Sequence, residues 1–242
     1  MIIDFNVHTG NWPEQYIHFG ESDLIQLMDS SGVNLSVVSD IGIVSGSAEN
    51  PQCGESTDDR LVHLRGVSPD ADLEELAADD SICGLRIYPT YQAWDFTSGY
   101  WNELLSLLEQ RNWMLHIYLR FRDPRIQAQV TDSDAVIKSL SSLAKEHKGL
   151  KLVFSGTNLY EADQNKGLFG RDNVWVDIAH LQHPMDSLSK LVDTLGDERI
   201  LFGSNAPFFY PYTEVFRVRN SRVSDSTSSR IFSENAVRLL GL

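Results

Sequence analysis

The chain has 242 residues, of which 42% are hydrophobic and 22% charged, so it is long enough for a large globular domain and too apolar for a disordered chain. Its net charge of −14 argues against nucleic acid or an anionic membrane surface as the main partner. No apolar run approaches the ~20 residues of a membrane span, no signal-peptide pattern opens the chain, and Cys53 and Cys83 lack metal-type spacing, so we expect a soluble, cytoplasmic protein.

Short apolar runs typical of buried strands recur at intervals of roughly 28 residues, which is the spacing of strand–helix–strand units. Most of them are apolar throughout rather than alternating, which favours parallel strands buried on both faces. The predicted strands are Ile2–Asn6, Asn34–Ser39, Leu61–Val67, Gly84–Tyr88, Trp113–Tyr118, Leu150–Phe154, Val174–Ile178 and Ile200–Phe202.

Helical spacing of apolar residues fills most of the gaps between these runs. The predicted helices are Ser22–Asp29, Asp72–Ala78, Trp101–Gln110, Asp132–His147, Met185–Leu195 and Ser233–Leu240, with a less regular pattern at Asn158–Gly170. Eight alternating strands and helices predict one (β/α)8 barrel domain over residues 1–242. A doubly wound open sheet is the alternative, although no glycine-rich phosphate loop follows the first strand.

Two of the predicted connections are long enough to carry function. Asp40–Arg60 is rich in Gly, Ser and Asp, and could be a flexible lid or a loop without a role. Pro89–Tyr100 contains four aromatic residues that could either wall a pocket or cap the barrel core. These are Tyr91, Trp94, Phe96 and Tyr100.

Polar side chains stand at the predicted carboxyl ends of the strands, where (β/α)8 barrels build their active sites. The first strand offers Asn6 and His8, which share one face because strand side chains alternate. The later strands offer Asp40, Arg86, Tyr88, His116, Tyr118, Arg120, Ser155, Asn158, Asp177, His180, Ser204 and Asn205.

Four segments in the right order resemble the amidohydrolase superfamily, in particular its amidohydrolase-related (type 2) branch. Asp4–Gly10 is similar to the Asp-x-His-x-His opening of that family, and Leu201–Pro207 to its strand-eight Gly-Ser-Asp-x-Pro signature. Gly84–Pro89 resembles the strand-four segment, and Ser233–Leu242 the C-terminal helix. The resemblance implies the (β/α)8 fold that the strand count also predicts.

The resemblance also implies a divalent metal, often zinc, held by histidines of strands one, five and six and an aspartate of strand eight. The chain keeps His8 and His116 but has Asn6, Ser155 and Asn205 at the other ligand positions. Neutral amide and hydroxyl groups are weaker ligands than imidazole or carboxylate, and an amide cannot accept a proton from an attacking water. We therefore expect a degenerate metal site and no cofactor; any metal that binds would use His8 and His116.

The leading hypothesis is a metal-independent hydrolase or lyase that acts on or binds a small, anionic organic molecule at the barrel mouth. A histidine would move protons, Arg86 would anchor a carboxylate or pair internally with an aspartate, and amides would stabilise an oxyanion. The candidate catalytic residues are His8, His116 and Asn205, and the candidate substrate-binding residues are Asn6, Arg86, Tyr88, Arg120 and Ser155.

Two other readings stay open. One is a non-catalytic barrel that serves as a binding or interaction module, and the other is a true metal-dependent hydrolase or decarboxylase. Neither nucleic acid nor a membrane is expected as a partner, and a homo-oligomer is left open.

Overall fold

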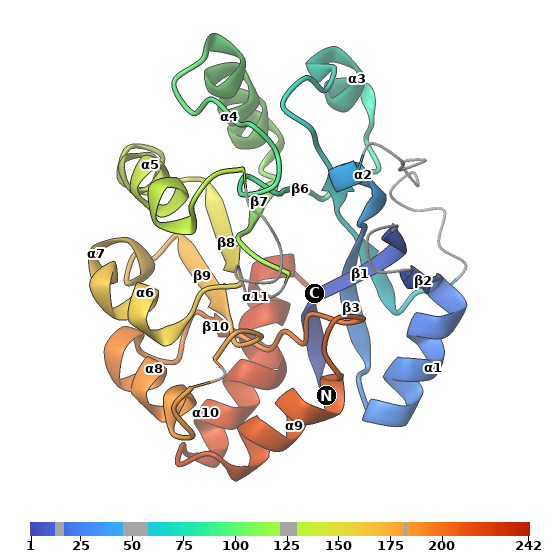
Figure 1. Ribbon diagram of the computed structural model, residues 1–242, viewed down its shortest axis with the longest axis vertical. Coiled ribbons are helices and arrows are strands. Elements are labelled where there is room, and N and C mark those ends of the chain that lie inside the picture. The colour runs from blue at the N-terminus through green and yellow to red at the C-terminus, as the bar shows by residue number, and fades with distance from the viewer. Residues whose placement is uncertain (13–16, 46–57, 122–129, 182) are drawn as a thin grey trace.

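The strands of the protein form the wall of a closed barrel, and the helices surround it (Figure 1). The structure is a computed structural model that describes residues 1–12, 17–45, 58–121, 130–181 and 183–242. The strands are β1 (Ile3–Trp12), β2 (Ile17–Phe19), β3 (Leu35–Asp40), β4 (Leu61–His63), β5 (Arg65–Gly66), β6 (Gly84–Ile87), β7 (Met114–Tyr118), β8 (Lys151–Ser155), β9 (Val174–Asp177) and β10 (Ile200–Leu201).

Hydrogen bonds order the strands as β2-β1-β3-β4 and β5-β6-β7-β8-β9-β10, and every pair except β1 with β2 is parallel. Only Leu64 separates β4 from β5, so together they form the third barrel strand. At the other seam, the N–H groups of Phe5 and His8 donate to the carbonyls of Phe202 and Ala206 at 2.9 and 2.8 Å. The predicted eight-stranded (β/α)8 barrel is confirmed.

The helices confirm most of the predicted pattern and add to it. They are α1 (Glu21–Ser31), α2 (Gly42–Ser45), α3 (Leu73–Ala78), α4 (Gly99–Arg111), α5 (Ser133–Glu146), α6 (Leu159–Gln164), α7 (Lys166–Phe169), α8 (Ser187–Leu195), α9 (Pro211–Asn220), α10 (Asp225–Ser229) and α11 (Asn235–Leu240), the last preceded by a π-helical turn at Arg230–Glu234. The sequence patterns missed α9, which starts at a proline whose fixed φ suits the first helical turn. The aromatic residues before this proline are more typical of a loop, so the pattern did not indicate a helix.

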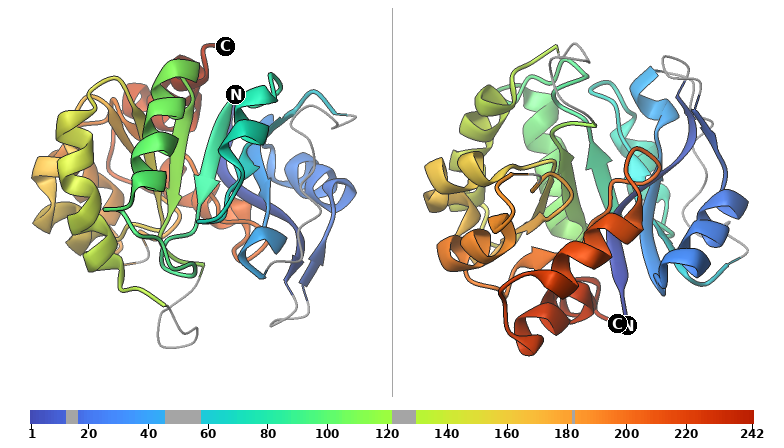
Figure 2. Two further views of the ribbon diagram at one scale, coloured as in Figure 1. Left: turned by 90° about the horizontal axis from the view of Figure 1, so that it is seen from above. Right: turned by 60° about the horizontal axis from the view of Figure 1, so that its bottom comes forward.

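Side-chain caps fix where the outer helices begin. The Asp132 carboxylate accepts the N–H of Asp134 at 2.8 Å at the start of α5, and Ser98 accepts the N–H of Trp101 at 3.2 Å at the start of α4. Helix α4 ends at Asn112, whose φ of 53° lies in the left-handed region. Figure 2 shows from two further directions that these helices stay outside the strands.

Three apolar layers surround the position of the site. The largest lies between the strands and the outer helices. A second fills the amino-terminal end of the barrel, where Ala236 and Leu239 of α11 pack against inward-facing strand residues such as Phe5 and Val153. A third lies at the carboxyl end and contains Trp12, Ile41, Tyr88, Tyr118 and Phe121.

Among the described residues, no helix combines the length and apolar character needed to cross a membrane. Most of the Asp40–Arg60 connection lies outside the described residues; of its first part, Gly42–Ser45 forms α2.

Candidate functional site

The structure brings nearly all of the predicted site residues to the carboxyl end of the barrel interior, between the second and third apolar layers. All but one of them are fully inaccessible to solvent, and Arg120 is 7% exposed. An irregularity in the pairing of β1 with β3 between Asp4 and Val7 breaks the strict alternation of β1. Residues brought together with no exposed surface are Asn6, His8, Arg86, Tyr88, His116, Ser155 and Asn205.

Arg86 of β6 is the centre of this layer. Its Nε donates to Nδ1 of His116 at 3.1 Å, and one terminal nitrogen donates to the carbonyl of Val7 and the hydroxyl of Ser39, both at 2.8 Å. The other terminal nitrogen faces the carbonyls of Phe5 and Val37 at 3.4 Å. All five N–H groups of the guanidinium therefore have acceptors within the chain.

This geometry corrects two expectations about Arg86. The side chain has no N–H left to anchor a substrate carboxylate, and its hydrogen-bond partners are carbonyls, a hydroxyl and an imidazole rather than Asp4, Asp40 or Asp177. A buried guanidinium satisfied in this way is a structural cation of the barrel interior.

A directed chain of hydrogen bonds runs from Arg86 through His116 to Asp177. Arginine only donates, so Nδ1 of His116 must accept, and the ring proton is on Nε2. Nε2 then donates to the hydroxyl of Ser155, which donates to the carboxylate of Asp177. Burial, then the charges of Arg86 and His8, hold the pKa of His116 well below its usual range. His116 is therefore a neutral imidazole with both nitrogens in use.

His8 differs because one of its nitrogens has no hydrogen-bond partner in the part of the chain that the structure describes. Its Nδ1 lies 3.5 Å from a terminal nitrogen of Arg86 and 3.4 Å from the hydroxyl of Tyr88. The positive charge beside Nδ1 favours a lone pair there over an N–H, and the hydroxyl of Tyr88 can donate to it, which leaves the ring proton on Nε2. Nε2 is buried without a hydrogen-bond partner among the described residues. Burial and the charge of Arg86 hold the pKa of His8 well below its usual range.

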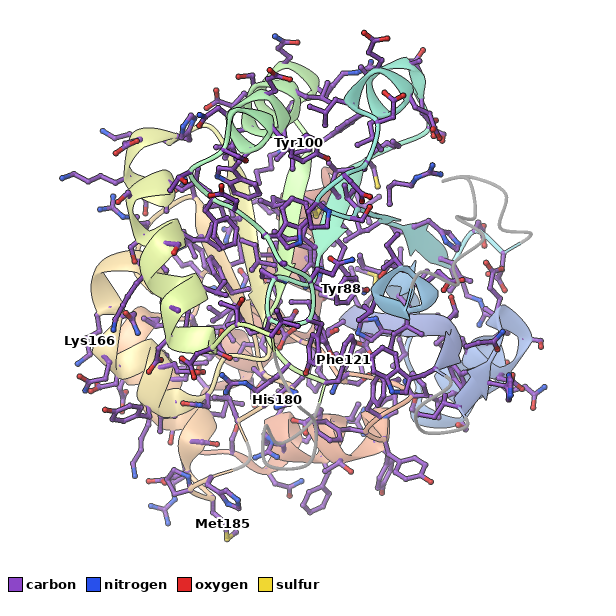
Figure 3. The ribbon with its side chains drawn as sticks, turned by 45° about the horizontal axis from the view of Figure 1, so that its top comes forward. Tyr88, Tyr100, Phe121, Lys166, His180 and Met185 are labelled. Carbon is purple, nitrogen blue, oxygen red and sulfur yellow. The ribbon has the colours of Figure 1, made fainter. Side chains whose placement is uncertain are left out.

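Aromatic rings enclose the imidazole of His8. Tyr118 meets it edge to face with ring centroids 4.7 Å apart, and Phe121 and Phe208 follow at 5.4 and 6.1 Å. Tyr91, from the long loop after β6, packs on Phe121 at 4.7 Å. In Figure 3 the labelled Tyr88 and Phe121 lie in the middle of the molecule with His180 near them. Nε2 of His8 is thus a polar atom in an aromatic enclosure.

The four aromatic residues of the Pro89–Tyr100 loop divide between two roles. Tyr91 alone belongs to the aromatic layer over the site. Trp94, Phe96 and Tyr100 pack against the large layer under the outer helices, where Trp94 and Phe96 contact the ring of Trp101. Packing against the apolar layers accounts for all four residues, and the role of Tyr91 as a pocket wall stays a prediction.

Asn205 is held in place at both ends of its amide. Its oxygen accepts from the hydroxyl of Tyr118, and its nitrogen donates to the carbonyl of Phe121 at 2.9 Å and faces Nε2 of His180 at 3.4 Å. Its φ of 62° places it in the left-handed region, which asparagine tolerates better than most residues. In this geometry it positions Tyr118 and Phe121, and it is not a free oxyanion donor.

Arg120 forms a buried ion pair with Glu161 of α6. Its terminal nitrogen is therefore engaged within the chain, while its Nε is buried without a hydrogen-bond partner in the described part of the chain. This geometry favours a structural role in holding α6 over the role of carboxylate anchor.

Asn6 and two carboxyl groups form the base of the site. Both amide atoms of Asn6 are buried without a hydrogen bond of ordinary geometry to the described residues. A Cβ on Gly203 would lie 3.0 Å from the Cβ of Asn6 and 2.9 Å from that of Asp177, so only glycine fits between them. Burial raises the pKa of Asp177 to about 6 and that of Asp4 to about 7.

Tyr118, Asp177, Ser39 and Phe121 belong to the site but were absent from the predicted site residues. Tyr118 and Asp177 stand at strand ends, which is a signal that the sequence contained. Ser39 also ends a predicted strand, whereas Phe121 does not, and the roles of both depend on the distant partners Arg86 and His8.

The ligand positions that the family resemblance assigns do not fit a divalent metal. The lone pair of His116 Nδ1 faces Arg86, Ser155 connects His116 to Asp177, and the amide oxygen of Asn205 accepts from Tyr118. Across the ranges that the structure describes, no three His, Cys, Asp or Glu side chains come together as a metal site would require.

A comparison with family models matches residues 57–242 to the family described as amidohydrolase. A search of the curated proteins found no match.

Solved structures share the whole fold at low sequence identity. A 2,6-dihydroxybenzoate decarboxylase complexed with 2,6-dihydroxybenzoate is 14% identical, with 100% of both chains covered and a TM-score of 0.77. A dihydroxybenzoic acid decarboxylase from Polaromonas sp. JS666 with bound manganese and 2-nitroresorcinol is also 14% identical, with 100% of this chain and 97% of that chain covered and a TM-score of 0.78. A putative 2-pyrone-4,6-dicarboxylic acid hydrolase from Pseudomonas putida is 17% identical, with 99% and 97% covered and a TM-score of 0.70. At these identities the likeness shows the fold.

Proposed function

The chain belongs to the amidohydrolase family, and from this premise we propose that it binds, and acts on, a small organic acid at the carboxyl-terminal mouth of the barrel without the family's full metal site. The reaction class would be hydrolysis or lyase chemistry. The observation that carries the proposal is Nε2 of His8, which is fully buried within aromatic side chains at this mouth and has no hydrogen-bond partner among the described residues.

A buried donor without a partner destabilises the protein by roughly 1–3 kcal/mol, so such groups usually have a functional explanation. The Nε2–H of His8 would donate to an oxygen of the bound molecule. Because burial keeps this imidazole neutral, it would act as a hydrogen-bond donor to developing negative charge, as neutral histidines do in some enzymes. The amide of Asn6 provides a further donor and acceptor deeper in the barrel.

The aromatic side chains and the comparisons support the ligand class. Rings of Tyr118, Phe121 and Phe208 can stack on a planar molecule. The similar structures are named for enzymes of aromatic or pyrone carboxylic acids, which supports this class by analogy of fold. The positive charge of Arg86, whose terminal nitrogen lies 3.5 Å from Nδ1 of His8, favours an anion at the other nitrogen of that ring.

The test is a calorimetric binding screen of aromatic and pyrone carboxylic acids, followed by product analysis for each acid that binds. We expect at least one acid to bind the wild type and His8→Phe to weaken it by roughly ten- to a hundredfold, since a hydrogen bond to a charged group contributes about 1.5–3 kcal/mol. His147→Gln, on a partly exposed histidine far along the chain, is the matched control and should bind like the wild type. Equal affinities of the wild type and His8→Phe would contradict the proposal.

A non-catalytic binding module is the second candidate, and two observations favour it. The polar groups of His116, Ser155 and Asn205 are committed to partners within the chain. Aromatic residues also occupy α9, where Tyr212 and Phe216 lie one helical turn apart and are 67% and 59% exposed. Binding of an acid with no product formed over long incubation would support this candidate over the enzyme.

A further inference from the structure

We infer that the guanidinium of Arg86 is the resident cation of this barrel: it occupies the centre of the polar layer, takes the histidine lone pair that a metal would need, and makes the protein independent of divalent metal. The inference rests on the metal-free part of the proposed function and not on the identity of the bound acid.

The first support is the position of Arg86. Its side chain is fully buried, and its acceptors come from three other strands of the barrel: Phe5 and Val7 on β1, Val37 and Ser39 on β3, and His116 on β7. No ion pair links it to a carboxylate among the residues that the structure places. A cation that donates hydrogen bonds to neutral acceptors on several strands links those strands inside the barrel, as a bound metal ion would.

The second support is the direction of the hydrogen bonds that leave Arg86. One chain runs through His116 and Ser155 to Asp177, and it fixes the proton of His116 on Nε2. The other runs to the hydroxyl of Ser39, which lies 2.9 Å from the hydroxyl of Tyr88. The guanidinium therefore decides which nitrogen of the imidazole carries its proton, as a metal bound to that ring would.

The third support is charge. A positive charge within 3.5 Å of both imidazoles repels a second cation in a water-poor interior, where the repulsion is much stronger than in water. The countercharge is Asp177, whose carboxylate stands at the end of the His116 chain. The layer thus contains a cation and an anion joined by hydrogen bonds, and adding a divalent ion would leave an excess of positive charge.

Two measurements on the wild-type protein test the inference directly. Elemental analysis after incubation with zinc or manganese, followed by desalting, should find far less than one equivalent of metal. Nitrogen-15 NMR of the histidine side chains should show His116 in the neutral form protonated on Nε2. Near-stoichiometric metal, or a proton on Nδ1 of His116, would overturn the inference.

A chemical rescue experiment tests the role of the guanidinium itself. Arg86→Ala should lower the thermal midpoint, and ethylguanidinium should restore at least about 3 °C of it, whereas the neutral analogue N-ethylurea should not. Arg230→Ala, which removes an arginine from a partly exposed pair with Asp197, is the matched control and should show no rescue. Equal effects of the two compounds, or no effect of either on folded Arg86→Ala, would overturn the inference.

If Arg86→Ala does not fold, the metal analysis and the NMR measurement on the wild type still test the inference. They also separate this inference from the proposed function. A wild type without metal and with the Nε2–H form of His116 supports the resident cation even if no organic acid binds.

Discussion

Asp4 is a single buried carboxyl that connects the first strand of the barrel to the segment after the last strand. Its Oδ1 accepts the N–H of Ser204 at 2.9 Å and that of Asn6 at 3.2 Å, so it joins β1 to the segment after β10. Burial raises its pKa from 3.8 to about 7, and the nearby charge of Asp177 adds to the increase. The residue is therefore a source of pH-dependent stability.

The sign of that dependence follows from proton binding. Between pH 4 and pH 7 the folded protein holds the proton of Asp4 and the unfolded chain releases it, so the stabilisation from this group is lost as the pH rises to 7. Asp4→Asn removes this titration. We expect the free energy of unfolding of the wild type, relative to the variant, to fall by about 3 kcal/mol between pH 5 and pH 8. Urea unfolding at intervals of one pH unit measures it.

Comparing the wild type with Asp4→Asn removes the opposing pH dependence of two buried histidines. Burial lowers the pKa of His8 and His116, so their contributions increase with pH up to about 6.5, but they are present in both proteins and largely cancel in the difference. Asp193→Asn, on an exposed carboxyl of α8, is the control and should show no such trend. Parallel pH profiles for wild type and Asp4→Asn would contradict the prediction.

At the scale of elements, α11 acts as the floor of the barrel. Ala236 and Leu239 enter the apolar layer at the amino-terminal end, beneath the polar layer that contains Arg86. The π-helical turn before α11 is bonded to the strand end, since the N–H of Phe202 donates to the carbonyl of Ile231 at 2.9 Å. The floor and the last strand are therefore one structural unit.

Leu239→Ala should lower the free energy of unfolding by about 2–5 kcal/mol, because it leaves a cavity among residues that come from most strands of the barrel. Leu242→Ala, on a leucine that is 66% exposed, is the matched control and should change stability by less than about 0.5 kcal/mol. Denaturant unfolding of both variants measures the difference. Similar losses in the two variants would show that α11 does not act as the floor.

At the scale of the whole molecule, barrel closure makes the two ends of the chain depend on each other. Strand β1 pairs with β3 and also bonds to the segment after β10, so neither half of the chain completes the wall alone. We propose that residues 1–242 form one cooperative domain. Helix α9 beside α1 continues the outer ring across the same seam (Figure 1).

Thermal unfolding should then be a single transition, with equal calorimetric and van't Hoff enthalpies and coincident near- and far-ultraviolet circular dichroism curves. The physical reason is that the closing hydrogen bonds join residues about as far apart in the chain as Phe5 and Phe202. Two resolved transitions, or probes that disagree, would show that the barrel separates into independent units.

Much of the fold was predictable because its signals are local. The strands are short apolar runs that recur at the interval expected for a (β/α)8 barrel. Helix starts such as Asp132 carry their own capping side chain. The misses have two origins. Helix α9 begins in an aromatic run that carries no local helix signal, whereas the irregularity in β1 belongs to its pairing with β3, which lies later in the chain.

The sequence predicted which residues gather at the candidate site, but it did not predict the role of each residue there. Position at a strand end correctly gathered His8, Arg86 and His116 in one layer, because parallel strands bring their carboxyl ends to one end of a barrel. Position at a strand end could not predict that all the N–H groups of Arg86 donate to carbonyls, Ser39 and His116, because those acceptors lie 30 to 81 residues away.

Neighbouring residues were enough to predict the barrel, its family and the set of side chains at its mouth, because apolar periodicity and short motifs are local signals. The tertiary structure alone decided which of those side chains are committed and which are not. Hydrogen-bond direction, burial and charge balance depend on groups from distant strands, and only their assembly leaves Nε2 of His8 without a hydrogen-bond partner among the described residues, beside the guanidinium of Arg86.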